Sequence, residues 1–293
     1  MSAFRAISGF KFFRKIAKSR PSGPDAPDRL LQFKNIHSGQ RCFVMGNGPS
    51  LGKMDLSMLQ NEIVFGCNNI FLLFDRIGWR PQYYTCVDSR VLPDRATEID
   101  DMLKSNPAMR AFFPCIVEEH FGERRRYGTR TILNPGQNRH FFHEVQSSEK
   151  YLPASMFSPD ADRYVVQPFT VAITMLQLAA YMGFSEIYLI GCDTTYHVPK
   201  TVTSDSGDAT IDGALVSTAD DDPNHFDPSY FGKGRKWHDP RPEKMIEHYQ
   251  HAKVALSGSG VQVFNATVGG ALEVFPRVDY DGLFADPKRR MVI

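Results

Sequence analysis

The sequence has almost no net charge. Its 34 lysines and arginines stand against 33 aspartates and glutamates, which gives a formal charge of +1 at pH 7 over 293 residues. Such a balance provides no overall field for nucleic acid, and we expect no nucleic-acid partner. No apolar run is long enough to span a bilayer, and basic residues interrupt the apolar stretches near the N-terminus, so we expect neither a membrane span nor a secretory signal.

Closely spaced cysteines are also missing. The five cysteines form no Cys-x-x-Cys pair, and four of them lie in or beside apolar, strand-like runs; they are Cys42, Cys67, Cys86, Cys115 and Cys192. This spacing predicts buried free thiols, and neither a disulfide framework nor a zinc site. We therefore expect a reducing compartment, the cytoplasm.

Acidic residues are absent from residues 1–24, which contain six basic ones. In a helical projection Phe10, Phe13 and Ile16 share one side, and most of the basic residues take the other. This pattern is typical of a helix in a membrane interface. We expect residues 1–20 to contact anionic lipid at the inner face of the cell membrane, and a frayed basic tail is the alternative.

Short apolar runs alternate with helical patterns along the rest of the chain. This alternation predicts an α/β domain with a Rossmann-like, doubly wound and mostly parallel sheet. We place strands at 41–45, 63–67, 83–87, 111–116, 186–190 and 261–264, and helices at 94–104, 171–182 and 242–256. A polar insertion at about 197–238, before the last helix and strand, is interpreted as a lid. We expect a basic segment and linker over 1–27 and one nucleotide-sugar-binding catalytic domain over 28–293.

The first predicted strand leads into the turn Gly46-Asn47-Gly48-Pro49-Ser50. Glycines let the backbone approach a ligand, proline suits the first helical position, and free N–H groups there would face a phosphate. The turn lacks the third glycine of a dinucleotide fingerprint because Leu51 stands there, and the second strand ends in Asn68 and not in an acid. The pattern favours a nucleotide over a dinucleotide, with a purely structural turn as the alternative.

Polar residues follow almost every predicted strand. Ligands of open parallel sheets bind beyond the carboxyl ends of the strands, so these residues form the predicted nucleotide site. They are Gly46, Asn47, Gly48 and Ser50 after the first strand, Asn68 and Asn69 after the second, Asp88 after the third, Asp193, Thr194, Thr195 and Tyr196 after the fifth, and Asn265 after the last. We expect Asn47, Asn68, Asp193 and Asn265 to meet in one crevice, with the turn at Asn265 lining a base pocket.

Five blocks of the sequence resemble a known family. They are RCFVMGNGPSLGKMDLSML, FGCNNIFLLFD, LAAYMGFSEIYLIGCDTTY, DDPNHFDPSYFGKGRKWHDP and VFNATVGGALEVFPRVDY. Together they resemble the bacterial domain-of-unknown-function family 115, described as 6-hydroxymethylpterin pyrophosphokinase-like. The first three also resemble the sialyltransferases of glycosyltransferase family 42 and the motility-associated factors that glycosylate flagellin. The resemblance covers roughly residues 38–284.

The resemblance implies an inverting, metal-independent glycosyltransferase. It implies transfer of a sialic-acid-like or Kdo-like sugar from a CMP-activated donor to a surface glycan, capsule or lipopolysaccharide acceptor, with no cofactor beyond the CMP-sugar. It places donor-binding asparagines at Asn47 and Asn68 and a helix-entry hydroxyl at Thr170.

The chain departs from the sialyltransferases at two places. They have a basic residue and a Ser-Gly pair where this chain has Pro168-Phe169-Thr170-Val171-Ala172, which leaves the donor sugar open. Their two phosphate-binding tyrosines are matched only loosely, by Thr195 or Tyr196 and by Tyr230.

An inverting transfer needs a base for the proton of the acceptor hydroxyl, and neutral histidine has a suitable pKa. We choose His238, which lies between the lid segment and the last helix, where the sialyltransferase base also lies. His225 and His197 are the alternatives. The neighbouring Asp239 could fix the tautomer of His238 or cap the helix.

The leaving phosphate needs positive charge or oriented donors. Lys233, Arg235 and Lys236 could supply this charge from a closing lid, and Tyr230 could donate a hydrogen bond to the phosphate; a solvated basic face is the alternative. We interpret Asp220-Asp221-Asp222 as an exposed acidic loop and expect no metal.

Two other functions remain open from the sequence. A pyrophosphokinase that moves diphosphate from ATP to a pterin alcohol would need Mg²⁺, with Asp88 and Asp193 converging on it. The second of these functions is that of a non-catalytic nucleotide-binding partner in glycan assembly. The sequence also allows a homo-oligomer.

Overall fold

The structure is a computed structural model that describes residues 20–119, 125–134, 136–146, 156–204 and 214–285. The basic segment on which the lipid-contact prediction rests lies almost wholly outside the described residues. Within the described part of the chain, no helix combines the length and apolar character that a membrane crossing needs.

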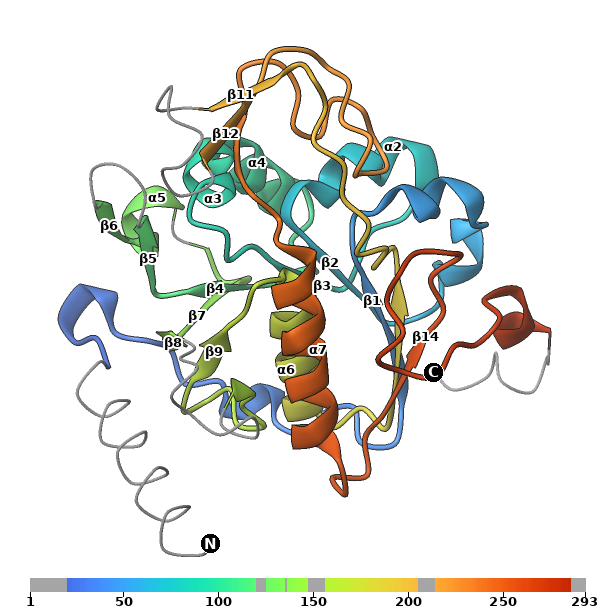
Figure 1. The fold of residues 1–293 in the computed structure, drawn as a ribbon. Helices are drawn as coiled ribbons and strands as arrows, with labels where there is room; N and C mark the ends of the chain where they lie inside the picture. Colours follow the sequence, from blue (N-terminus) through green and yellow to red (C-terminus); the bar gives the residue numbers. More distant parts are fainter. Residues whose placement is uncertain (1–19, 120–124, 135, 147–155, 205–213, 286–293) are drawn as a thin grey trace, which may run out of the picture.

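A seven-stranded parallel sheet forms the centre of the molecule (Figure 1). Its strands are β1 (Arg41–Met45), β2 (Val64–Cys67), β3 (Tyr83–Thr85), β4 (Arg110–Pro114), β7 (Arg139–Phe142), β10 (Glu186–Ile190) and β14 (Gln262–Asn265). Their order is β14-β10-β1-β2-β3-β4-β7, and every neighbouring pair is parallel. The connectivity therefore reverses between β1 and β10, and such a reversal opens a crevice beyond the carboxyl ends of the two strands.

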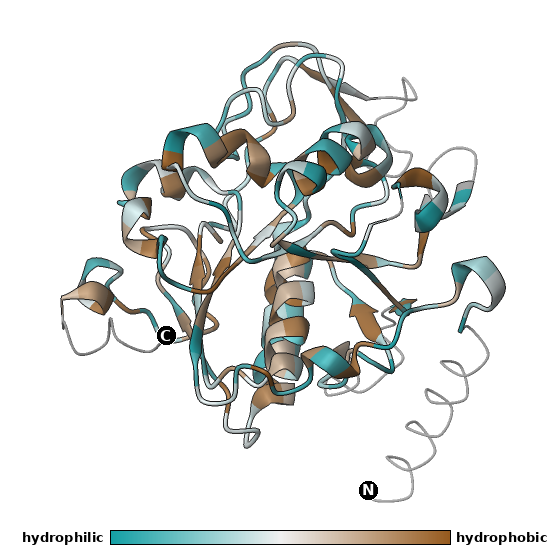
Figure 2. Ribbon diagram, turned by 180° about the vertical axis from the view of Figure 1, so that it is seen from behind, coloured by the Kyte–Doolittle hydropathy of each residue, from teal (hydrophilic) through white to brown (hydrophobic). Residues whose placement is uncertain are grey.

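Helices cover both faces of this sheet (Figures 1 and 2). Successive side chains of a strand point to opposite faces, so Phe43 and Met45 join one apolar cluster while Cys42 and Val44 join the other. The first cluster includes residues of α2 (Phe74–Ile77), α3 (Val91–Asp94) and α4 (Ala96–Ser105), and the second includes residues of α6 (Val171–Met182) and α7 (Pro242–Leu256). The predicted doubly wound, Rossmann-like α/β fold is confirmed.

The nearly apolar sequence of α6 explains its place in the core. Almost all of its residues are buried, and the helix stops at Gly183, which adopts the left-handed conformation with φ 88°. Short 3-10 helices occur at Gly23–Asp25, Leu31–Phe33, Pro49–Lys53, Leu56–Leu59, Asn68–Leu73 and Asp281–Phe284.

Shorter elements that the sequence does not predict complete the fold. They are the helix α5 (Thr129–Ile132), the antiparallel pair β5 (Ile116–Glu119) and β6 (Arg125–Gly128), the parallel pair β8 (Glu144–Gln146) and β9 (Val165–Gln167), and the antiparallel strands β11 (Val202–Ser204), β12 (Ala214–Ser217) and β13 (Lys236–His238). The last three belong to the polar insertion. Its strand β13 ends at His238, shortly before α7 begins.

Candidate functional site

Polar side chains surround a small crevice at the reversal of the sheet. Its lining includes Gly46, Asn47, Gly48, Asn68, Thr170, Asp193, Thr194, Thr195, Tyr196 and Tyr230. Asn47, Asn68 and Asp193 therefore lie around one crevice, as their places at the strand ends predict.

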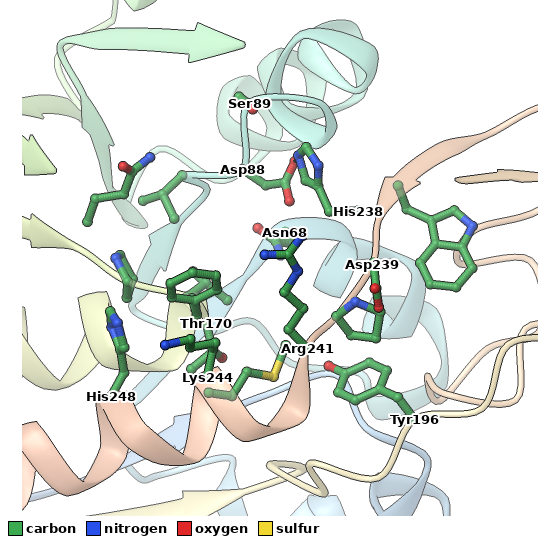
Figure 3. Close-up of a pocket in the computed structure, with 18 of the residues that line it drawn as sticks. Asn68, Asp88, Ser89, Thr170, Tyr196, His238, Asp239, Arg241, Lys244 and His248 are labelled. Atoms are coloured by element: carbon green, nitrogen blue, oxygen red, sulfur yellow. The ribbon is translucent and has the colours of Figure 1, made fainter. Parts of the chain in front are cut away.

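The crevice continues into a larger cavity of about 670 Å³. Asn68, Thr170, Tyr196 and Tyr230 line both spaces. The rest of the cavity wall comes from the body of the sheet, the start of α6, the insertion and the first turns of α7 (Figure 3); it includes Asp88, Glu118, Phe169, Phe231, Trp237, His238, Arg241, Lys244 and His248. A volume of this size is typical of a small-molecule site.

The glycine turn after β1 packs against the turn after β10. A Cβ atom at Gly46 would collide with the carbonyl oxygen of Gly191, and one at Gly48 would collide with the carboxylate of Asp193. These glycines therefore permit a close approach between two parts of the chain.

The anion at this turn is Asp193 itself. The amide nitrogen of Ser50 donates to Asp193 Oδ1 at 3.2 Å, and Ser50 Oγ donates to Asp193 Oδ2 at 2.7 Å. The prediction that the helix start leaves its N–H groups free for a phosphate is wrong at Ser50, because a buried carboxylate already takes this donor. Burial raises the pKa of Asp193, and the hydrogen bonds from Ser50 act in the opposite direction.

Three buried amide oxygens lie next to the crevice. Asn47 donates through Nδ2 to Tyr230 Oη at 2.9 Å and to the carbonyl of Cys67 at 3.1 Å. Its Oδ1 atom, like those of Asn68 and Asn69, receives no hydrogen bond from any described residue. A buried carbonyl without a donor costs about 1–3 kcal/mol, so these oxygens can gain from a ligand that brings N–H or O–H groups.

Tyr230 fixes the insertion to the body of the protein. It is 1% exposed, and its backbone carbonyl accepts from Asn69 Nδ2 at 3.1 Å and from Arg95 at 3.2 Å. Its ring stacks on the imidazole of His225 with a centroid distance of 3.8 Å. Burial raises the pKa of Tyr230 far above that of a free phenol, so its hydroxyl remains protonated.

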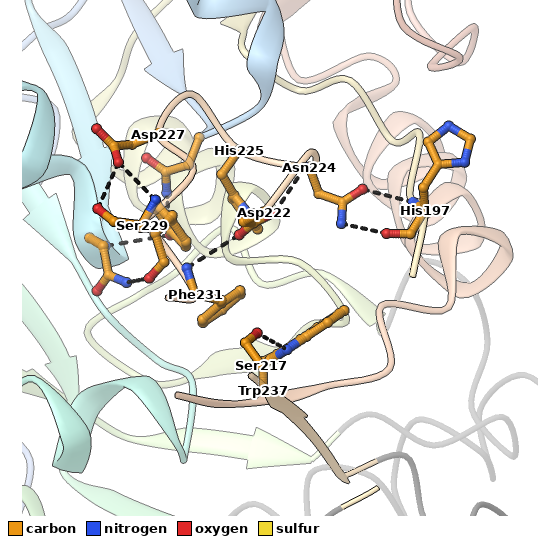
Figure 4. A network of polar contacts seen from close by, with 12 residues as sticks. His197, Ser217, Asp222, Asn224, His225, Asp227, Ser229, Phe231 and Trp237 are labelled. Carbon is orange, nitrogen blue, oxygen red and sulfur yellow. Dashed lines mark hydrogen bonds and ion pairs between the residues drawn. The ribbon is translucent and has the colours of Figure 1, made fainter. Parts of the chain in front are cut away.

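His225 is oriented by a buried carboxylate (Figure 4). Its Nδ1 atom lies 2.8 Å from Asp222 Oδ2, and the Asp222 side chain is only 6% exposed. The interpretation of residues 220–222 as an exposed acidic loop is therefore wrong for Asp222. Asp220 accepts a hydrogen bond from the amide of Lys233, and Asp221 accepts one from the hydroxyl of Thr201.

His238 lies at the end of β13 on the wall of the larger cavity (Figure 3). Its Nε2 atom is 3.6 Å from Asp88 Oδ1, and the same oxygen accepts from the amides of Arg90 and Val91 at the start of α3. The carboxylate beside His238 is therefore Asp88. Asp239 is exposed and does not cap α7, whose N-cap position is Arg241. His197, an alternative base, is exposed and outside the lining of both spaces.

The predicted lid cations do not face the cavity. Lys233, Arg235 and Lys236 are absent from its lining, and Arg235 instead binds Asp94 at 2.7 Å, which ties the insertion to α3. The cations on the cavity wall are Arg241 and Lys244, which the sequence-based prediction missed. The sequence feature that could have identified these two cations is their position at the start of the last helix, directly after His238.

Asn265 was predicted to line the crevice and does not. Its Nδ2 atom donates to the carbonyl of Leu272 at 2.7 Å, and its Oδ1 atom accepts from the amide of Thr267 at 3.0 Å. The side chain thus closes its own turn. The same turn holds the backbone of Asp193 in place, because the amide of Ala271 donates to the carbonyl oxygen of Asp193.

The remaining predicted residues fall into two groups. Thr194 and Thr195 lie on the crevice wall, where Thr194 has a left-handed backbone with φ 54° and Thr195 is exposed. Ser50 and Asn69 lie behind the wall and hold Asp193 and Tyr230 in place. Among the residues that the structure describes, no three side chains of His, Cys, Asp or Glu are grouped in a way that could hold a metal ion.

Residues 13–198 match the family model MptE-like, described as 6-hydroxymethylpterin diphosphokinase MptE-like. The chain belongs to this family. The matched residues include the crevice residues from Gly46 to Tyr196, and they end before most of the insertion and before α7. No curated protein matches the sequence.

Several solved structures are similar to this MptE-like chain. The MAf glycosyltransferase of Magnetospirillum magneticum AMB-1 is 16% identical with a TM-score of 0.47, over 86% of this chain and 37% of that one. The sialyltransferase CstII of Campylobacter jejuni, in complex with cytidine-5'-monophosphate, is 15% identical with a TM-score of 0.43, over 82% of this chain and 85% of that one. The α-2,3-sialyltransferase Cst-I of the same organism is 16% identical with a TM-score of 0.43, over 82% and 80%.

Proposed function

We propose that this MptE-like protein transfers an acidic sugar from a CMP-activated donor to a hydroxyl group of a glycan acceptor, with inversion. The observation that carries the proposal is His238 beside Asp88 on the wall of a cavity that opens from the strand-end crevice. A base next to a nucleotide-sized site is what a transfer to a hydroxyl requires.

The crevice, of about 80 Å³, can hold one part of the nucleotide, and the rest would extend into the larger cavity. The buried oxygens of Asn47 and Asn68 can accept from the amino group of the base or from ribose hydroxyls. The helix α6 begins at the crevice, where Thr170 and Val171 line the wall, so its positive end would face a phosphate bound there. We assign to this helix start the phosphate contact that the sequence predicts at the glycine turn.

In the proposed transfer, His238 accepts the proton that the acceptor hydroxyl loses. The acceptor oxygen forms a bond to the anomeric carbon while the bond from that carbon to the phosphate oxygen breaks, and CMP leaves with the electron pair. The acceptor proton passes to the imidazole of His238, and the Asp88 carboxylate stabilises the imidazolium that results. The contact of 3.6 Å is longer than a hydrogen bond, which is common before substrate is bound.

A second candidate is an ATP-dependent diphosphokinase that acts on a pterin alcohol. The description of the family favours it. Phe231 and Trp237 stack on each other on the cavity wall with a centroid distance of 5.6 Å, and an aromatic surface of this kind could stack with a planar pterin. Against it, the carboxylate of Asp193 is bound to Ser50 and that of Asp88 to the start of α3, so the acid pair expected for Mg²⁺ is already engaged.

Thermal unfolding with a panel of nucleotides separates the candidates. A ligand at 100 times its Kd stabilises the folded state by about 2.7 kcal/mol, which is easily measured. We expect CMP and CDP to raise Tm without added metal. A shift that appears only with ATP and Mg²⁺ would favour the diphosphokinase. Binding of a CMP-sugar without any transfer to oligosaccharide acceptors or to water would indicate a non-catalytic partner.

We further propose that the protein works in the cytoplasm, at the inner face of the cell membrane. The support is the basic, amphipathic sequence of residues 1–20, which would carry the catalytic domain to lipid-linked acceptors. Flotation with vesicles that contain anionic lipid tests this. Deletion of residues 1–20 should release the protein, and continued flotation of the shortened chain would contradict the proposal.

A further inference from the structure

Arg241 has an unusual backbone conformation for an arginine. It occupies the N-cap position of α7 with φ 43° and ψ 68°, in the left-handed region, and Pro242 follows it. A residue other than glycine held there costs on the order of 1–3 kcal/mol. Its side chain makes no capping hydrogen bond in return. Asparagine or glycine would suit this position better, so local folding preferences do not explain the arginine.

The side chain of Arg241 extends into the larger cavity (Figure 3). Within the described residues its guanidinium has no hydrogen bond and no ion pair. The neighbouring cation Lys244, by contrast, binds Glu247 at 3.0 Å. Arg241 is thus a charged group presented to the cavity and not neutralised by the described part of the chain.

The side chains of the cavity wall carry more acidic than basic groups. Four acidic side chains line the wall, namely Asp88, Glu118, Asp239 and Glu247. The cation Lys244 is engaged by one of them, and the amides of the crevice are neutral. The guanidinium is therefore a side chain of this wall that offers a positive charge to an anion in addition to the start of α6.

We infer that Arg241 binds the carboxylate of the donor sugar and so selects acidic over neutral sugars; this inference rests on the proposed function. An acidic sugar of this class has two anionic groups, the phosphate and a carboxylate, both attached to the anomeric carbon. The start of α6 faces the phosphate at the crevice, and Arg241 reaches the cavity from the N-terminal end of the neighbouring helix, α7. A planar guanidinium can bind a carboxylate through two parallel hydrogen bonds.

The substitution Arg241→Asn tests the inference with little risk to folding, because asparagine tolerates the left-handed region and is a favourable N-cap residue. The measurements are the Kd values for CMP, for CMP-N-acetylneuraminic acid and for the methyl ester of this sugar nucleotide. We expect the Kd for the acid to rise about 10- to 100-fold, as for a lost charged hydrogen bond, and the Kd for CMP to stay within about twofold. The preference of the wild type for the acid over the ester should disappear.

A matched control is Lys104→Met, which removes an exposed cation of α4 outside the cavity lining and should leave all three Kd values unchanged. The Tm of the free Arg241→Asn protein should be equal to or above that of the wild type. If the substitution weakens CMP and CMP-N-acetylneuraminic acid equally, Arg241 binds the nucleotide and the carboxylate assignment is overturned. An unchanged Kd for the acid overturns it too. If the wild type binds none of the cytidine nucleotides, the proposed function fails, and the assignment fails with it.

Discussion

At the scale of single residues, Asp193 explains why the turn after β1 contains glycine and serine. Its carboxylate takes the amide and hydroxyl of Ser50 and stands where Gly48 leaves room for it. A Gly-Asn-Gly-Pro-Ser turn after a strand can thus bind either of two anions, the phosphate of a ligand or a carboxylate of the protein itself. The sequence could not separate the two, because Asp193 lies more than 140 positions away and only the parallel pairing of β1 with β10 brings it there.

The substitution Gly48→Ala should destabilise the protein by about 1–3 kcal/mol, because the new methyl group would force the Asp193 carboxylate away from Ser50. Urea unfolding measures the change. The control is Gly52→Ala in the same turn, where a Cβ atom meets no other atom within 4 Å. Equal effects of the two substitutions would show that the contact with Asp193 is not the cause.

The substitution His238→Ala should reduce transfer at least about 100-fold, as expected for the loss of a general base. The Kd for CMP should change little, because the proposed role of His238 is to take the proton of the acceptor and not to bind the nucleotide. Turnover of a CMP-sugar with an oligosaccharide acceptor is the measurement. His197→Ala, an exposed histidine outside the lining, should retain full activity. If His238→Ala retains it as well, the base is another group, and His225 beside Asp222 is the next to test.

At the scale of elements, the sequence predicted best where the apolar pattern is continuous. The strands at 41–45 and 186–190 and the helices at 171–182 and 242–256 agree with the structure residue for residue. The other predicted strands are present with ends that differ by one or more residues.

The elements that the sequence missed have weak or mixed patterns. The edge strand β7 reads Arg-His-Phe-Phe and β13 reads Lys-Trp-His, and neither shows the alternation or the apolar run of a strand. They are held by their partners, β4 and β12. In the site, too, contacts that the local sequence pattern does not show decide where a side chain points. Asn265 follows a strand as predicted, but hydrogen bonds within its own turn decide where the amide points.

The insertion depends on Tyr230 for its attachment. In Tyr230→Phe, the Nδ2 atom of Asn47 loses its 2.9 Å partner, which should cost about 1 kcal/mol. The loop around the tyrosine should open more often, because the amide of Phe226 donates to the carbonyl of Asn47 in the same contact. Hydrogen exchange should show faster exchange at the amide of Phe226.

The control is Tyr188→Phe, which removes a hydroxyl that donates to Glu186 on the central strand β10. This variant should leave exchange at Phe226 close to that of the wild type. Equal acceleration in both variants would mean that the loop opens only with global unfolding.

At the scale of the whole molecule, stability should depend on pH through Glu144. Burial raises the pKa of this carboxyl to about 8, and the nearby charge of Glu118 acts in the same direction. The folded state therefore keeps a proton that the unfolded chain loses near pH 4.5, so the free energy of unfolding falls as pH rises towards 8. Burial lowers the pKa of His140 and of His248 to about 4, and it also lowers the pKa of His37, so these histidines act in the opposite direction, from about pH 4 to above pH 7.

The same histidines titrate in the wild type and in Glu144→Gln, so the difference between the two proteins isolates Glu144. In the window between pH 6.5 and 8, the wild type should lose about 1–2 kcal/mol of stability relative to Glu144→Gln. Denaturant unfolding at both pH values provides the test. Glu273→Gln is the control, since Arg277 lowers the pKa of this exposed carboxyl and its titration lies far below the window. An unchanged slope in Glu144→Gln would refute the assignment.

The larger cavity is built from two separate stretches of the chain. Six of the seven strands of the sheet, the start of α6 and the crevice residues from Gly46 to Tyr196 lie within residues 13–198, the span of the family model, whereas Tyr230, His238 and Arg241 come after it. Proteins that share the first stretch can have lost or exchanged the chemistry of the second, so within this family the chain beyond residue 198 is where a change of substrate should be sought.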